Sequence, residues 1–192
     1  AKLLPFKNYK GEKLAQLEII ATKNHENESN MIDGFAVDSF YSFVIPSSIK
    51  SGIYTLSDTI PLVVKSRVPV EVTVVYPYAN NHIYTNSNGK SIFENKSKGV
   101  SLKRNSKICD YSKSMNDFFE YIDKNYETSY VTDLDLEDTT QFFQSDVIVF
   151  YGIISFWTPE MRSNFLRFNA KGGSTLVAAD NFMANIFWWG KE

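Results

Sequence analysis

Four residues that follow predicted strands carry side chains able to hold a ligand: Tyr84, Ser155, Trp157 and Asp180. A phenol, a hydroxyl, an indole and a carboxylate offer hydrogen bonds, a stacking surface and a negative charge. In an open α/β sheet, ligands bind in the crevice beyond the carboxyl ends of the strands, which is where these residues are expected. We therefore predict a ligand-binding crevice lined by the four, with no catalytic residue assigned. The alternative is that Tyr84 and Trp157 only pack against the edge of the sheet.

An acidic run formed by Asp133, Asp135, Glu137 and Asp138 suggests either a metal site or acid–base chemistry. Carboxylates two residues apart on a strand point to the same face, so Asp133 and Asp135 could share one side. The run also lies between a predicted strand and a predicted helix, where Asp caps a helix N-terminus and acidic side chains complement the helix dipole. We favour this structural interpretation over a metal site.

The other candidate nucleophiles and bases are few. Cys109 is the single cysteine, which excludes an internal disulfide and a thiolate zinc cluster. It precedes a predicted helix, whose N-terminus would lower the pKa of a thiol, but no glycine-flanked elbow surrounds it. His25 and His82 lie in polar segments, and we expect His82 to be a solvated loop residue. Residues 152–156 (GIISF) do not form the Gly-x-Ser-x-Gly elbow of a serine hydrolase.

Composition restricts the classes of function. The chain has 192 residues, of which 43% are hydrophobic and 22% charged, so most of it is expected to fold around a core. The net charge of −2 argues against binding to nucleic acid or to an anionic membrane surface. The longest apolar run, residues 147–157, is about half of the roughly 20 residues that a spanning helix needs. The N-terminus has no signal-peptide pattern, so we expect a cytoplasmic protein.

The first third of the chain, residues 1–68, reads as β structure. Short runs rich in Val, Ile, Tyr and Phe are separated by Ser, Gly, Pro and Asp, as is typical of antiparallel strands. The predicted strands are residues 14–21, 40–46, 52–56 and 60–65, with a polar loop over residues 23–30. Four strands at this spacing predict a short, partial β-sandwich-like segment.

The rest of the chain, residues 69–192, alternates strands with helical patterns. Predicted strands cover residues 70–76, 129–136, 146–153 and 174–179, and predicted helices begin near Ser112 and at Thr158. A long polar stretch over residues 80–107 is expected to be a functional or mobile loop. Because helices connect the strands, the crossovers are right-handed and the sheet is parallel. We predict a doubly wound, flavodoxin-like α/β domain.

Several separated motifs then point to one family. Residues 130–136 (YVTDLDL), residues 157–162 (WTPEMR), Gly172–Gly173, Asn181 and the pair Trp188–Trp189 occur in this order. With further motifs over residues 51–54, 60–64 and 83–92, the chain resembles the C-terminal region of the large (beta) subunit of N,N-dimethylformamidase and its relatives, over about residues 45–190. The resemblance implies a β-sandwich-like segment followed by a domain with the fold of class I glutamine amidotransferases. It also implies a shortened domain, because relatives continue beyond the paired tryptophans.

The enzyme of this family is an iron-dependent amide hydrolase, whose iron is held by two tyrosines and a glutamate. A hard ferric ion suits such oxygen ligands and would polarise an amide carbonyl or activate water. The resemblance places Tyr84 at the first tyrosine. The second should follow residues 100–104 (VSLKR), where Asn105 and Ser106 stand, and the glutamate position is taken by Ser155. Two of the three ligands are therefore missing.

Two functions follow as hypotheses. The first is a diverged, metal-free member of the family that acts as a binding or assembly module, without a cofactor. The second is an amide hydrolase with altered iron ligands, or one completed by a partner subunit. A small molecule is a possible ligand of the crevice. The aromatic residues Phe187, Trp188 and Trp189 either plug the base of the sheet or form a surface for a second copy or a partner chain.

Overall fold

The structure, a computed structural model, describes residues 2–25, 38–57, 60–85, 92, 102, 113–138, 140 and 143–189. The chain divides into two compact units. We call residues 1–62 with 81–111 the β unit, and residues 63–80 with 112–192 the α/β unit. The domain division predicted after residue 68 stays a prediction.

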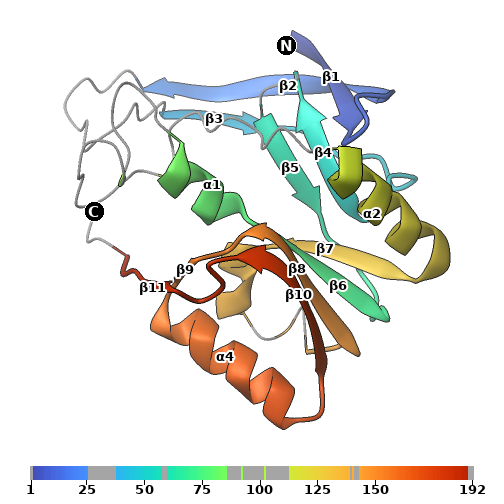
Figure 1. Cartoon of the computed structure of the whole chain (residues 1–192). Coiled ribbons are helices and arrows are strands. Elements are labelled where there is room, and N and C mark those ends of the chain that lie inside the picture. Colours follow the sequence, from blue (N-terminus) through green and yellow to red (C-terminus); the bar gives the residue numbers. More distant parts are fainter. Residues whose placement is uncertain are drawn as a thin grey trace. The chain divides into compact units, whose positions relative to one another are not determined.

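A five-stranded sheet, in the order β3-β2-β1-β4-β5, forms the first part of the chain (Figure 1). The strands are β1 (Lys2–Asn8), β2 (Lys13–His25), β3 (Asp38–Ser42), β4 (Gly52–Leu56) and β5 (Ile60–Val64). Strand β1 pairs antiparallel with β2 and β4, and β2 pairs antiparallel with β3. The predicted antiparallel sheet is confirmed, although the described residues of this unit form one sheet and not the two layers of a sandwich.

Two details of this sheet differ from the sequence-based prediction. Strand β1 was not predicted, and it carries Pro5 although a strand pairs with it on each side. Strand β2 extends to His25, so residues 23–25 are not part of a loop. In β2, Leu17 and Ile19 are buried whereas Glu18 is exposed, and this alternation gives the sheet one buried face.

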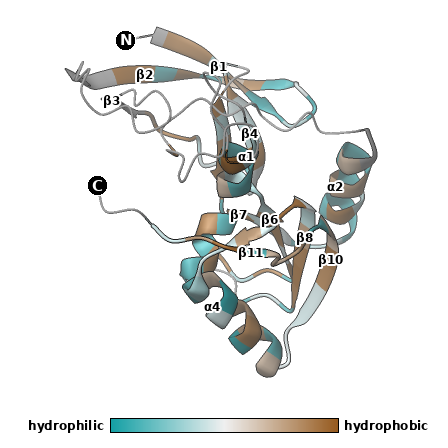
Figure 2. Ribbon diagram, turned by 60° about the vertical axis from the view of Figure 1, so that its left-hand side comes forward, coloured by the Kyte–Doolittle hydropathy of each residue, from teal (hydrophilic) through white to brown (hydrophobic). Residues whose placement is uncertain are grey.

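A four-stranded parallel sheet, in the order β10-β8-β6-β7, forms the centre of the α/β unit. Its strands are β6 (Val72–Tyr76), β7 (Thr128–Thr132), β8 (Val147–Ile153) and β10 (Ser174–Asp180). These strands were all predicted from the sequence. The inner strands β6 and β8 are apolar, brown in Figure 2, as expected for strands that are covered on both faces. The predicted mixed α/β class with a parallel sheet is confirmed.

Two helices cover opposite faces of this sheet. Neighbouring residues on a strand point to opposite faces, and in β8 the ring of Phe150 meets Phe165 of α4 (Pro159–Ala170). The next residue, Tyr151, stacks on Phe118 of α2 (Lys113–Asn125) with 5.1 Å between ring centroids. The two faces of the sheet are therefore packed by different helices, α4 on one and α2 on the other (Figure 1).

Helix α4 begins and ends as its sequence predicts. The hydroxyl of Thr158 accepts a hydrogen bond from the N–H of Met161, and Pro159 occupies the first turn. At the other end, Gly172 has a φ of +94°, a conformation that glycine adopts without strain. Buried Met161, together with Phe165 and Phe168, anchors the helix to the core.

Several short elements lie at the carboxyl ends of the parallel strands. Helix α1 (Tyr78–Tyr84) follows β6, and a 3₁₀ helix, η1 (Asp133–Glu137), follows β7. Strand β9 (Phe156–Trp157) follows β8 and pairs in parallel with β11 (Asn185–Ile186). The prediction of an unstructured stretch from residue 80 is therefore wrong for α1, and the strand predicted over residues 129–136 ends at Thr132. Of the helices that the structure describes, none is long and apolar enough to cross a membrane.

Candidate functional site at the carboxyl ends of the parallel strands

Asn80 joins the ends of three strands through its side-chain amide. It lies in the first turn of α1 and is fully buried. Its Oδ1 accepts hydrogen bonds from the N–H groups of Ser155 (3.0 Å) and Phe156 (2.8 Å). Its Nδ2 donates to Oδ2 of Asp133 (2.9 Å) and to the carbonyl of Phe156 (3.2 Å). The amide thus uses its full hydrogen-bonding capacity to hold the segments that follow β6, β7 and β8 together.

Asp133 is a buried carboxylate that caps α1. Its Oδ1 accepts from the N–H of Ala79 (2.8 Å), and its Oδ2 accepts from the N–H of Asn80 (3.0 Å) as well as from the Asn80 side chain. Burial raises the pKa of the Asp133 carboxyl above its ordinary value, and the hydrogen bonds from Asn80 and Ala79 offset this only in part. The pKa of Tyr78 is also raised, mainly by burial and further by the charge of Asp133. The acidic run was predicted to cap the helix that follows it, whereas Asp133 caps α1, which precedes the run in the chain.

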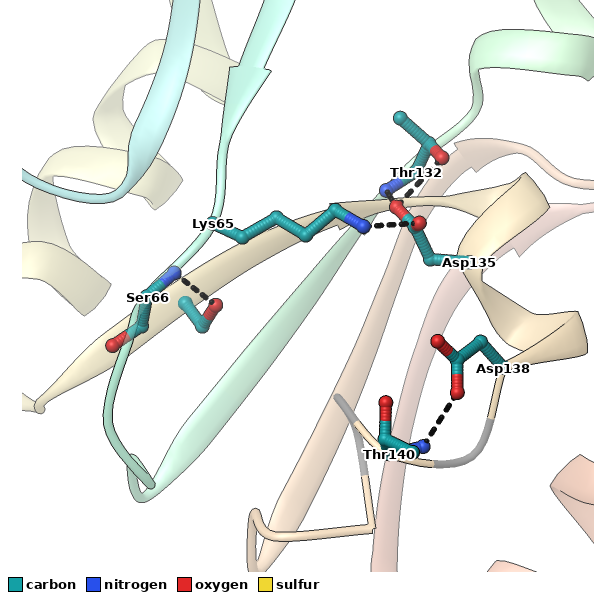
Figure 3. A network of polar contacts seen from close by, with 7 residues as sticks. Lys65, Ser66, Thr132, Asp135, Asp138 and Thr140 are labelled. Atoms are coloured by element: carbon teal, nitrogen blue, oxygen red, sulfur yellow. Dashed lines mark hydrogen bonds and ion pairs between the residues drawn. The ribbon is translucent and has the colours of Figure 1, made fainter. Parts of the chain in front are cut away.

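Asp135 and the linker after β5 form the network drawn in Figure 3. The N–H and the hydroxyl of Thr132 donate to Oδ2 of Asp135 at 2.7 and 2.8 Å, which caps η1. Lys65 donates to Oδ1 of the same carboxylate at 2.5 Å, and the N–H of Ser66 donates to the hydroxyl of Ser129 (Figure 3). Asp135 is thus committed to a helix cap and an ion pair.

The last two acidic side chains of the run also have structural partners. Glu137 accepts hydrogen bonds from the Thr158 hydroxyl (2.6 Å) and from the Trp189 indole (2.8 Å) through the same oxygen. Asp138 accepts from the N–H of Thr140, and hydrogen bonds from this residue lower the pKa of the carboxyl. Among the described residues, no three His, Cys, Asp or Glu side chains gather as a metal site would require.

Ser155 and Trp157, two of the residues predicted to line a crevice, lie in the interior. Ser155 is fully buried, and its carbonyl accepts from the N–H of Asn185 (2.8 Å). Trp157 is also fully buried, and its indole donates to the carbonyl of Ile154 (2.9 Å) and packs against Phe150. The turn after β8 brings these two residues together. Trp157 is therefore part of the hydrophobic core of the α/β unit.

The other two predicted site residues lie elsewhere. Asp180 is the last residue of β10 and is exposed. Tyr84 is the half-buried last residue of α1 and belongs to the β unit. His82, expected in a solvated loop, is instead buried in α1. Cys109 lies outside the described residues, as do Asn105 and Ser106. A crevice lined by all four predicted residues stays a prediction.

The C-terminal aromatic segment continues from β11 beside β9, where the N–H of Phe187 donates to the carbonyl of Trp157 and Phe187 packs against the core. Successive side chains of this extended segment point in opposite directions. Phe187 packs edge-on against Trp189 at 5.0 Å, and Trp189 is held by Glu137. Trp188 points away and is 75% exposed. The segment is fixed on one side and presents an indole on the other.

Comparison with known proteins identifies the family. A family model described as N,N-dimethylformamidase beta subunit-like, C-terminal, matches residues 13–191. The chain belongs to this family. The resemblance seen over about residues 45–190 is therefore confirmed and extends back to the start of β2. No curated protein matches the chain.

The residues that sequence reasoning missed are Asn80 and its partners. Asn80 was assigned to a loop because residues 80–107 form a long polar stretch rich in Asn, Ser, Gly and Lys. The signal that could have found it is the pair Asn80–Asn81 a few residues after a buried strand, together with Asp133 directly after the neighbouring strand. In a parallel sheet these positions lie at one edge.

Proposed function

We propose that this domain has lost the iron site of its family and acts as a binding or assembly module. The observation that carries the proposal is Ser155, which stands where the family resemblance implies a glutamate ligand. A neutral hydroxyl is a poor ligand for a hard ferric ion compared with a carboxylate. The side chain is also fully buried.

The carboxylate nearest in the network does not replace the missing glutamate. Asp133 accepts three N–H hydrogen bonds, from two main-chain groups and the Asn80 side chain. To bind a metal it would have to give up the cap of α1, and buried N–H groups left without acceptors cost about 1–3 kcal/mol each. The donor set of this edge therefore does not fit the family's iron ion, and we derive no catalytic step through it.

The topology supports the amidotransferase-like fold that we propose for this domain. Numbered along the chain, the four parallel strands have the spatial order 4-3-1-2, which is the first four strands of the flavodoxin-like order. The crevice of such folds opens between the strands that are here β6 and β8. Asn80 bridges this point by binding the main chain of Ser155 and Phe156. We therefore propose that ligands or partners contact the rim of this edge.

The exposed aromatic side of the C-terminal segment supports the assembly role. Ile186 is 52% exposed and Trp188 75% exposed, and alternation along an extended segment places both on the same side. Large apolar side chains on a surface are characteristic of interaction sites. We propose that Phe187, Trp188 and Trp189 contribute to contact with another protein chain.

Metal analysis of the purified protein, expressed with added iron, tests the proposal. We expect no stoichiometric iron, no tyrosinate-to-iron charge-transfer band and no hydrolysis of N,N-dimethylformamide. A matched variant, Tyr84→Phe, removes the one family ligand that is present and should leave these readouts unchanged. One iron per chain with a band that Tyr84→Phe abolishes would refute the proposal and support an amide hydrolase with altered ligands.

A further inference from the structure

After β10, the chain returns across the carboxyl end of β8. We call residues 181–187 the strap, which includes β11 and runs beside β9 (Figure 1). The N–H groups of alternate strap residues donate to main-chain carbonyls of the segment that follows β8: Met183 to Ile154 (3.2 Å), Asn185 to Ser155 (2.8 Å) and Phe187 to Trp157 (3.1 Å). The strap therefore binds the main chain at the position where the family resemblance implies a metal ligand.

The backbone of the strap is strained at Met183. Both Asn181 (φ of +51°) and Met183 (φ of +57°) have left-handed conformations. Asparagine adopts this conformation with little penalty, whereas in methionine it brings Cβ too close to the following carbonyl oxygen. A strained residue keeps its conformation only where its surroundings hold it, and such residues cluster at switch regions. The closed strap thus depends on contacts that outweigh a local strain.

Phe182, between these two residues, anchors the strap in the aromatic core. Its ring packs edge-on against three others: Phe150 at 4.9 Å, Trp157 at 5.2 Å and Phe165 at 5.6 Å between centroids. Edge-on pairs at these distances are favourable beyond the area that they bury. The three core rings also pack against one another, at 5.5 Å for each pair. The core cluster is therefore complete without the ring of the strap.

Arg162 of α4 is incompletely satisfied when the strap is closed. Its Nη2 donates to the carbonyl of Met183 at 2.9 Å, while its Nε is buried and has no acceptor among the described residues. A buried donor without a partner destabilises the state in which it is buried, and withdrawal of Met183 would admit water to this group. The strain at Met183 and the unpaired Nε therefore both oppose closure.

We infer that the strap opens as a unit while the parallel sheet and α4 stay folded. Opening breaks the three main-chain bonds and withdraws Phe182, but it relieves the strain at Met183 and the unpaired Nε of Arg162. The free energy of opening is therefore smaller than that of global unfolding, as is typical of segments that control access to a site. An open strap uncovers Trp157 and the main chain of Ser155.

The strap is thus a gate for the edge at which we propose that ligands or partners bind. This role rests on the proposed function, but the opening itself is measured without ligand and without iron. A strap that does not open would overturn this inference alone. Stoichiometric iron would overturn the proposed loss of the metal site alone.

Native-state hydrogen exchange, followed by NMR at low concentrations of urea, tests the opening. The amides of Met183, Asn185 and Phe187 donate bonds that break together, so we expect them to share one protection factor. We expect it to be at least roughly a hundredfold below that of the amides of β8 and independent of urea, because local opening exposes little surface. Protection as high as in β8, unequal protection of the three amides or no protection at all would overturn the inference.

Two matched substitutions separate local opening from global unfolding. Phe182→Leu removes ring contacts that the strap loses on opening, so exchange of the strap amides should rise roughly tenfold. Phe143→Leu removes a stacked contact with Phe168 outside the strap. It should accelerate the amides that exchange by global unfolding and leave the strap amides unchanged. Strap amides that respond equally to both substitutions would show that the strap unfolds only with the whole unit, which refutes the inference.

Discussion

Replacing Asp133 by Asn tests whether this carboxylate is the cap that holds the carboxyl edge together. The carboxylate accepts three hydrogen bonds with two oxygens, and every donor is buried with it. An asparagine side chain keeps one acceptor and turns the other position into an NH₂ group that faces N–H donors. At least one buried N–H then loses its partner, and one bond to a charged acceptor becomes neutral.

The expected loss of stability follows from these bonds. A buried donor left without a partner costs about 1–3 kcal/mol, and bonds to a charged acceptor are worth about 1.5–3 kcal/mol. We expect Asp133→Asn to lower the free energy of unfolding by about 2–4 kcal/mol in urea denaturation. The matched control is Asp180→Asn at the exposed end of β10, which should change it by less than about 0.5 kcal/mol. Equal effects of the two substitutions would refute the capping argument.

The shifted pKa of Asp133 also predicts how the free energy of unfolding changes with pH. Burial raises the pKa of Asp133 in the folded protein above the ordinary 3.8, so between these two values the folded protein binds more protons than the unfolded chain. The free energy of unfolding of the native protein relative to Asp133→Asn should therefore fall as pH rises from 3.8 through the folded pKa, and stay constant above it. A relative stability that rises over this interval would mean that the hydrogen bonds outweigh burial, contrary to our reasoning.

Two further substitutions test the packing of α4. A Cβ at Gly173 would lie 2.2 Å from Cζ of the Phe168 ring, which is buried in the core, so Gly173→Ala should lower the melting temperature through a loss of about 1–3 kcal/mol. Gly172→Ala, next in the chain and strained only by its φ of +94°, should cost about 1 kcal/mol, and a larger loss there than at Gly173 would contradict the overpacking argument. Thr158→Ala removes the N-cap of α4 and the hydrogen bond to Glu137, so urea denaturation should show a loss of about 1–2 kcal/mol. Thr158→Ser keeps the hydroxyl and should retain most of that stability.

Most regular elements of the α/β unit could be predicted because their determinants are local. Helix α4 carries its own cap, a proline at its start and glycines after its end, so a short window of sequence defines it. Strands β6 and β8 are continuous apolar runs, and burial on both faces follows from that pattern. Within the acidic run, the structural role of Asp135 is local, since it accepts from the N–H of Thr132 and caps the turn in which it lies.

The parts that could not be predicted depend on contacts between distant positions. Helix α1 is polar and short. Its first turn is stabilised by Asp133, which accepts from the N–H of Ala79 although the two residues are 54 positions apart in the sequence. Ser155 was expected at a crevice because it follows a strand, but it is fully buried, and its main chain bonds to Asn80 and to Asn185. Strand β10 was predicted to be buried, but Leu176 is 46% and Val177 43% exposed. The burial of a strand depends on the elements that cover it, which its own residues do not specify.

The network at the carboxyl edge explains how the family's ligand position can change without loss of the fold. Asn80 holds the turn after β8 through the main-chain N–H groups of Ser155 and Phe156 and the main-chain carbonyl of Phe156. Asn185 likewise bonds to the carbonyl of Ser155, and not to its side chain. Because these four bonds use only main-chain atoms at both positions, they do not depend on which side chain residue 155 carries. The main-chain scaffold of this edge therefore tolerates a change of side chain at position 155, as the proposed loss of the iron site requires.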